Sequence, residues 1–179
     1  MNVPNLLSIS RILAVPVFIV LMLDPTPGRA LWAGGVFALA SITDWFDGYY
    51  ARKWDQITKI GKLLDPLADK ILIASALIVL LNTDPELVPA WMVIIIVSRE
   101  IAVTGLRAKA AAEGIIIAAD TLGKYKVGAQ ITAVLAFVLV HAVGGAMLVL
   151  LGTMALWVSV LLALLSGGQY FIAYWRKLG

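Results

Sequence analysis

The sequence predicts an all-α membrane protein with six transmembrane helices. Of its 179 residues, 61% are hydrophobic and only 14% are charged, whereas charged residues make up about a quarter of a soluble globular domain. The mean hydropathy of +0.95 agrees with this class. The hydrophobic residues gather in six long segments, each near the ~20 residues that cross the hydrocarbon core of a bilayer as a helix. These segments are 6–23, 30–46, 67–81, 88–106, 127–143 and 146–165.

The first segment, 6–23, is expected to be a retained helix whose polar start lies along the membrane surface. It has an early Arg11 but no small-residue cleavage site, and further apolar segments follow it, which argues against a removed signal peptide. The other five segments follow at short intervals, so that only short connections remain between them. We therefore expect a single integral-membrane domain over residues 1–179, with no separate soluble domain.

The distribution of basic residues predicts the orientation in the membrane. With six helices both termini lie on the same side, and every Lys and Arg except Arg29 falls on or toward that side. By the positive-inside rule this side, with both termini, is cytoplasmic. The sequence pI of about 9.3 also favours anionic lipids and phosphate-bearing substrates. Nucleic-acid binding is not expected, because the basic residues are dispersed among the apolar segments. The absence of cysteine excludes disulfides, thiolate catalysis and cysteine metal ligands.

Four aspartates at the cytoplasmic ends of the second and third segments are the candidate functional residues. Asp44 and Asp47 lie one helical turn apart, and Asp65 and Asp69 are spaced i, i+4, so each pair shares a helix face. The short connection makes the two helices antiparallel neighbours, which can bring all four carboxylates into one cluster. A plain alternative is that the aspartates cap helix ends and balance nearby lysines. Ionisable groups at membrane depth are functional by default, and four facing each other favour a site.

Clustered carboxylates repel one another, so we expect a cation among them. Oxygen ligands without His or Cys indicate a hard cation, Mg²⁺ or Mn²⁺, with Ca²⁺ also open, and two such ions could clamp a diphosphate. Gly48 and Gly61 leave gaps on the helix surfaces where a ligand can approach the backbone. Arg52, one turn after Gly48, can reach the same ligand with its guanidinium fork.

The pattern resembles the signature of the CDP-alcohol phosphotransferase family, Asp-x-x-Asp-Gly-x-x-Ala-Arg-(x)8-Gly-x-x-x-Asp-x-x-x-Asp, and residues 44–69 meet all eight fixed positions. The resemblance implies six transmembrane helices, a homodimer and a cytoplasm-facing active site in which two divalent metals hold the diphosphate of a CDP-linked lipid. It implies that Asp44, Asp47 and Asp65 bind metal and that Asp69 is both a ligand and the general base. It further implies that Gly48, Arg52 and Gly61 contact CDP.

Other segments are similar to the bacterial phosphatidylglycerophosphate synthases, a group within this family. They are 4–11, 43–48, 65–70, 98–107 and 123–126. Val127 departs from that group, which usually has Thr at this position. The similarity implies a bacterial inner-membrane enzyme in phospholipid biosynthesis, with CDP-diacylglycerol and glycerol 3-phosphate as substrates and membrane lipids around it.

A second basic group is the candidate pocket for the phosphate of the acceptor. Its members are Arg99, Arg107, Lys124 and Lys126. An acceptor with its own phosphate needs such a pocket, whereas free inositol or serine does not. The alternatives are a structural ion pair between helices for Arg99 and Glu100, and ordinary topology charge for Lys124 and Lys126. His141, the only histidine, is placed at the outer end of the fifth segment and is given no catalytic role.

The expected reaction is attack by the primary hydroxyl of glycerol 3-phosphate on the lipid-side phosphorus of CDP-diacylglycerol, with release of CMP. The alternatives are a related enzyme with another acceptor, such as phosphatidylglycerol or inositol phosphate, and a cation-coupled carrier. A carrier would be expected to have related halves or broken helices, and the sequence indicates neither.

Overall fold

Six helices make up the fold, confirming the all-α prediction. The structure is a computed structural model, and it describes the backbone of residues 3–54, 59–114 and 121–178 and the side chains of 8–43, 67–114 and 122–177. No strand occurs in these ranges. The helices are α1 (Val3–Met22), α2 (Pro27–Trp54), α3 (Lys59–Thr83), α4 (Ala90–Ala112), α5 (Thr121–Val143) and α6 (Ala146–Leu178). Each predicted apolar segment falls in its own helix.

The helix ends follow from local sequence. Pro27 opens α2, where its missing N–H would have had no partner in the helix. Between α5 and α6 stand Gly144 and Gly145, with φ angles of 68° and 106°. These are backbone conformations that glycine adopts without the steric cost of a side chain. The two-residue connection therefore folds α6 back along α5.

The helices pack as a bundle whose centre is apolar. Helix α1 packs against both α2 and α3, while α5 packs against α6 and α2. The rings of Phe18 on α1 and Phe37 on α2 lie 5.6 Å apart between centroids. Gly152 lets α6 approach α5, since a Cβ there would lie 2.8 Å from the ring of Phe137. Close contact at a small residue is typical of helix pairs in membranes.

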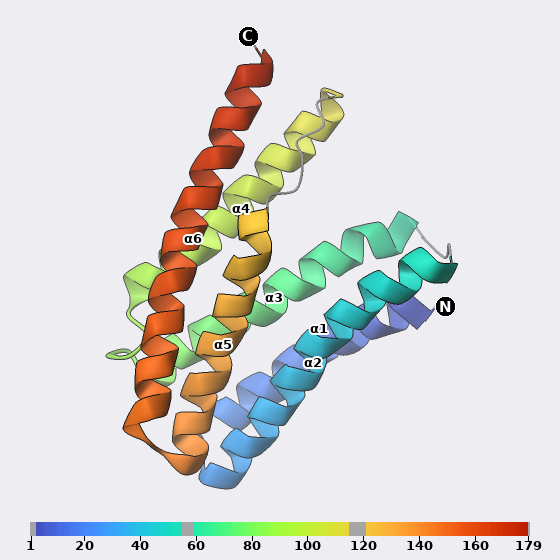
Figure 1. The fold of residues 1–179 in the computed structure, drawn as a ribbon. Coiled ribbons are helices and arrows are strands. Elements are labelled where there is room, and N and C mark those ends of the chain that lie inside the picture. Colours follow the sequence, from blue (N-terminus) through green and yellow to red (C-terminus); the bar gives the residue numbers. More distant parts are fainter. Residues whose placement is uncertain (1–2, 55–58, 115–120, 179) are drawn as a thin grey trace.

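The connections 23–26, 84–89 and 144–145 gather at the lower left of Figure 1, and both termini lie away from them. From this end α3 and α4 diverge. This arrangement agrees with helices that alternate in direction along the chain. The divergence of α3 from α4 is the feature of the fold that shapes the site described below.

Two helical stretches in the described part of the chain are both long and apolar enough to cross a membrane, Leu122–Val143 and Ala146–Lys177. Ser8–Met22 is apolar but shorter. Helices α2, α3 and α4 carry charged residues in their cytoplasm-assigned halves, which lowers their mean hydropathy. Six helices are thus established, whereas six membrane crossings remain a prediction.

Candidate active site

The four predicted aspartates lie on two helices that contact each other. Asp44 and Asp47 belong to the last third of α2, and Asp65 and Asp69 to the first half of α3. Only four residues, 55–58, separate the two helices, and α2 and α3 touch directly. The side chains of Asp44, Asp47, Asp65 and Arg52 lie outside the described residues. The surroundings of Gly48 and Gly61 lie outside them as well. The proposed carboxylate cluster and its CDP contacts therefore remain a prediction.

Asp69 is the member of this set whose side chain is described. It is half-buried and lines a cavity of about 490 Å³ between α3, α4 and α5. Lys70, Glu100, Thr104 and Gln130 also contribute to the cavity, and its remaining walls are mostly Ile, Leu, Val and Ala. Among the described side chains no group of three His, Asp or Glu gathers as for a metal ion. The polar groups around Asp69 are instead cationic, amide and hydroxyl groups together with Glu100.

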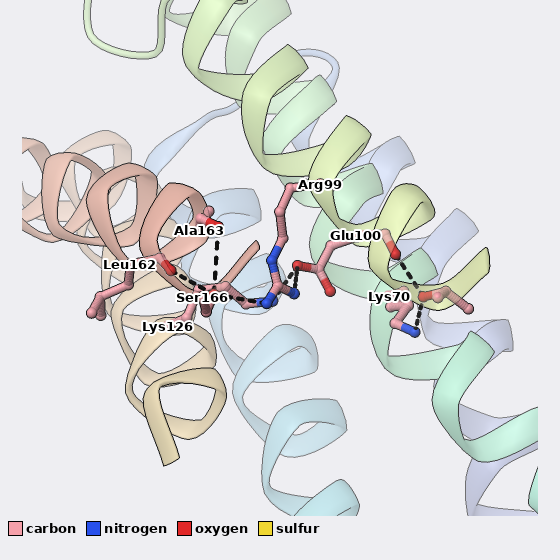
Figure 2. Close-up of polar contacts among 8 residues, drawn as sticks. Lys70, Arg99, Glu100, Lys126, Leu162, Ala163 and Ser166 are labelled. Carbon is pink, nitrogen blue, oxygen red and sulfur yellow. Dashed lines mark hydrogen bonds and ion pairs between the residues drawn. The ribbon is translucent and has the colours of Figure 1, made fainter. Parts of the chain in front are cut away.

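Glu100 on α4 is joined to α5 through a largely buried ion network (Figure 2). Its Oε1 atom accepts from Arg99 Nη1 at 3.0 Å and also pairs with the ammonium of Lys126 on α5. The Lys126 side chain is only 3% exposed, and those of Arg99 and Glu100 are 11% and 20% exposed. One carboxylate thus faces two cations. Breaking a buried pair by removing one partner typically costs about 3–5 kcal/mol, so Glu100 is expected to matter for stability as well.

Ser166 extends this network to α6. Its hydroxyl accepts a hydrogen bond from Arg99 Nη2 at 2.7 Å and donates to the carbonyl of Leu162 at 2.6 Å. Next to it, a Cβ on Gly167 would lie 3.3 Å from Arg99 Cγ, so the stem of Arg99 packs closely over the α6 backbone. The Glu100 carboxylate and the Ser166 hydroxyl therefore hold the Arg99 guanidinium in one orientation.

Lys70, the residue after Asp69, is fixed to α4. Its ammonium donates to Thr104 Oγ1 at 2.6 Å, and the Thr104 hydroxyl in turn donates to the carbonyl of Glu100 at 2.6 Å. Figure 2 shows Lys70 on the other side of Glu100 from Ser166. Through Lys70 the segment of α3 that carries Asp69 is tied to the same turn of α4 that organises the ion network.

The structure brings together two of the four basic residues predicted to bind the acceptor phosphate. Arg99 and Lys126 meet at Glu100, so the ion pair weighed for Arg99 is present. Arg107 and Lys124 are exposed, and neither forms an ion pair in the described part of the chain. The network still holds one positive charge more than it holds negative charge.

The sequence analysis missed the roles of Ser166, Thr104 and Gln130. Ser166 lies in the last helix, whose sequence is apolar and carries no motif. Gln130 has a polar amide side chain but is only 1% exposed. An amide residue within an apolar segment was the one sign in the sequence of a buried polar contact there. The contact of Lys126 with Glu100 spans 26 residues, a separation over which helix periodicity gives no information.

Comparisons with known proteins agree with the motif. The family model for CDP-alcohol phosphatidyltransferase matches residues 1–165. A relative from Bacillus subtilis is 44% identical, over 99% of this chain and 97% of its own length. Relatives from Rickettsia bellii and Wigglesworthia glossinidia brevipalpis are 38% and 33% identical, over 96% and 99% of this chain and 94% and 97% of their own lengths. All three are named CDP-diacylglycerol–glycerol-3-phosphate 3-phosphatidyltransferase. This chain belongs to the CDP-alcohol phosphatidyltransferase family.

Proposed function

We propose that this protein transfers the phosphatidyl group of CDP-diacylglycerol to sn-glycerol 3-phosphate, giving phosphatidylglycerophosphate and CMP. The observation that carries the proposal is the similarity, over nearly the whole chain, to relatives named for this reaction. The ion network beside Asp69 supports it, because its excess positive charge suits an acceptor with a phosphate of its own.

The setting we propose is the bacterial inner membrane, with six crossings, both termini and the active site on the cytoplasmic side, and one catalytic domain over residues 1–179. Two apolar helical stretches support membrane insertion. So do the exposed apolar side chains along α6, such as Leu150, Leu161 and Leu165, which need an apolar surrounding. A homodimer is part of the proposal.

Two divalent ions, Mg²⁺ or Mn²⁺, are proposed at Asp44, Asp47, Asp65 and Asp69. The donor set fits such ions, because it consists of carboxylates alone on two touching helices. When bound, the ions would neutralise the diphosphate and stabilise the charge that develops on the leaving CMP.

The protein's own side chains bind the two substrates, orient them and deprotonate the acceptor hydroxyl. Gly48 and Gly61 would let CDP approach the helix backbones, and Arg52 would grip it as a fork. Arg99 and Lys126, with Arg107 and Lys124 nearer the surface, would hold the acceptor's phosphate. Its primary hydroxyl oxygen then forms a bond to the lipid-side phosphorus while the bond from that phosphorus to the oxygen of CMP breaks. Asp69 takes the hydroxyl proton as general base.

The test is a measurement of CMP release by purified protein with CDP-diacylglycerol, Mg²⁺ and a panel of acceptors. We expect release with glycerol 3-phosphate and little with phosphatidylglycerol, inositol phosphate, inositol or serine. The variant Asp69→Asn should retain CDP-lipid binding and lose nearly all turnover. Asp24→Asn, at an exposed site on the other end of the bundle, is the matched control. Full turnover by Asp69→Asn would remove Asp69 from its role. Metal-dependent flux without CMP would favour a carrier.

A further inference from the structure

The cavity beside Asp69 is elongated along the helices that form it. On α3 it is lined by residues over 67–74, and on α4 by residues that recur on one face over 96–105. Its floor is made by Val127 and Gln130 of α5. Two of its walls belong to α3 and α4, the helices that diverge in Figure 1. Its volume of about 490 Å³ is typical of a ligand site.

The cavity has a polar end and an apolar end. Asp69, Lys70 and Thr104 lie toward the ends of α3 and α4 that the proposed topology makes cytoplasmic. Ile73, Ala74, Ile96 and Val97 lie deeper. The rim is also apolar, since Ile71 and Ile101 are 42% and 68% exposed. An occupant would therefore need a charged or polar head and a long apolar body.

Gln130 supplies an unmet hydrogen-bond donor inside the cavity. Its side chain is 1% exposed and lines the cavity, and its Nε2 atom has no hydrogen-bond partner among the described residues. Buried amide groups nearly always have a partner. An acceptor oxygen on the occupant would satisfy it. At the polar end, the bond to Thr104 uses one of the three donors of the Lys70 ammonium, so an anionic group is also complemented.

We propose that this cavity binds the acylglycerol part of the CDP-linked donor: one acyl chain lies between α3 and α4, and an ester carbonyl accepts from Gln130 Nε2. An acyl ester has the three features that the cavity requires, namely an apolar chain, an uncharged acceptor and a linked phosphate. The choice of the donor over other lipids rests on the proposed function, since Asp69 lines the same cavity.

The first experiment labels the site without turnover. Full-length protein in phosphatidylcholine vesicles is irradiated with CDP-diacylglycerol that carries a diazirine in one acyl chain, and the labelled residues are mapped by mass spectrometry. We expect labels on Ile71 and Ile101. Gly105→Leu should reduce these labels about tenfold, because Gly105 lines the cavity and a Cβ there meets nothing within 4 Å. Gly35→Leu is the matched control, at an exposed helical glycine that is equally open but far from the cavity in sequence and outside its lining.

The second experiment tests the carbonyl contact. Gln130→Leu should weaken binding of the ester-linked donor about fivefold, as expected for one lost hydrogen bond, and leave an ether-linked donor within about twofold of wild type. Equal weakening for both donors would overturn the carbonyl contact. Equal labelling by diazirine phosphatidylcholine would make the cavity a groove for bulk lipid and would overturn the assignment to the donor.

Two further outcomes separate this inference from the proposed function. A protein that releases CMP but is labelled evenly over all its helices would refute the cavity while the reaction stands. A protein with the expected labels but no CMP would refute the reaction and support a lipid site. Because the chain has no cysteine, Ile101→Cys provides a single thiol. Efficient crosslinking of two such chains through it would show that a second copy covers the cavity, and would overturn the proposal.

Discussion

Two carboxylates that join helices in this protein differ in their balance of charge. Glu100, midway along α4, pairs with two cations, Arg99 and Lys126. Asp84, directly after α3, pairs with one group, His141 on α5, at 2.6 Å, and accepts a second bond from the neighbouring hydroxyl of Thr83 at 2.9 Å. Both contacts tie separate helices together. The pair at Asp84 has one carboxylate and one imidazole and so no excess positive charge, whereas the group at Glu100 has two cations for one carboxylate. Only the group at Glu100 therefore has the excess charge that the proposed binding of an anionic acceptor requires.

Removal of the Glu100 charge should have the largest effect. Glu100→Gln leaves two buried cations with a neutral partner, which is expected to cost about 3–5 kcal/mol. In a chain of this size that corresponds to a fall in Tm of roughly 10 °C, read by tryptophan fluorescence of the purified protein. We also expect CMP release to fall about 100-fold or more.

The matched control for this substitution is Glu86→Gln, an exposed glutamate in the connection after α3. If Glu100→Gln melted at the same temperature as Glu86→Gln, the network would not be a stabilising one. The contrast with Asp84 would then lose its basis.

Lys126→Met should convert the network into a one-to-one pair like that at Asp84. Arg99 still neutralises Glu100 in this variant, so we expect a smaller loss of stability than for Glu100→Gln. The excess charge is gone, and KM for glycerol 3-phosphate should rise about tenfold, equivalent to ~1.4 kcal/mol. KM for CDP-diacylglycerol should not change.

Lys126→Arg keeps the charge and should recover part of the affinity for glycerol 3-phosphate. Lys177→Met, which removes an exposed cation near the end of α6, controls for net charge. An unchanged KM for glycerol 3-phosphate in Lys126→Met would mean that Lys126 stabilises the fold and does not bind the acceptor.

Ser166→Ala tests how the orientation of Arg99 is fixed. The hydroxyl of this fully buried serine accepts a 2.7 Å bond from the guanidinium, and a hydrogen bond to a charged group contributes about 1.5–3 kcal/mol. Ser159 is an equally buried serine on the same helix, but its described bond, at 2.8 Å, goes to the carbonyl of Leu156 in its own helix. We expect Ser166→Ala to lower Tm clearly and Ser159→Ala to change it little. Equal shifts would mean that the bond to Arg99 adds nothing to stability.

The helices could be predicted from the sequence because long apolar segments bounded by Pro27 and by the Gly144–Gly145 pair have one physical solution in a bilayer. Membership of the family followed from eight residues at fixed spacing. The charge balance at Glu100 could not be predicted, because Lys126 comes from α5 and Ser166, the partner of Arg99, comes from α6. How these two helices are placed relative to α4 cannot be read from the sequence. Of the basic group predicted to bind phosphate, Arg99 and Lys126 pair with Glu100, while Arg107 and Lys124 are exposed. Binding of phosphate by this group stays a prediction.

The smallest effect is expected at the Asp84–His141 pair. This pair has no member as buried as Lys126, which is 3% exposed, since both of its side chains are 19% exposed. We therefore expect it to contribute about 1 kcal/mol or less. A double-mutant cycle with Asp84→Asn and His141→Gln should give a coupling energy in this range, and all three variants should release CMP within about twofold of wild type. If either single variant lost about tenfold in turnover, the size of the effect expected on KM for Lys126→Met, then charge balance would not distinguish the Asp84 site from the Glu100 site. The excess positive charge at Glu100 would no longer be a reason to place the acceptor's phosphate there.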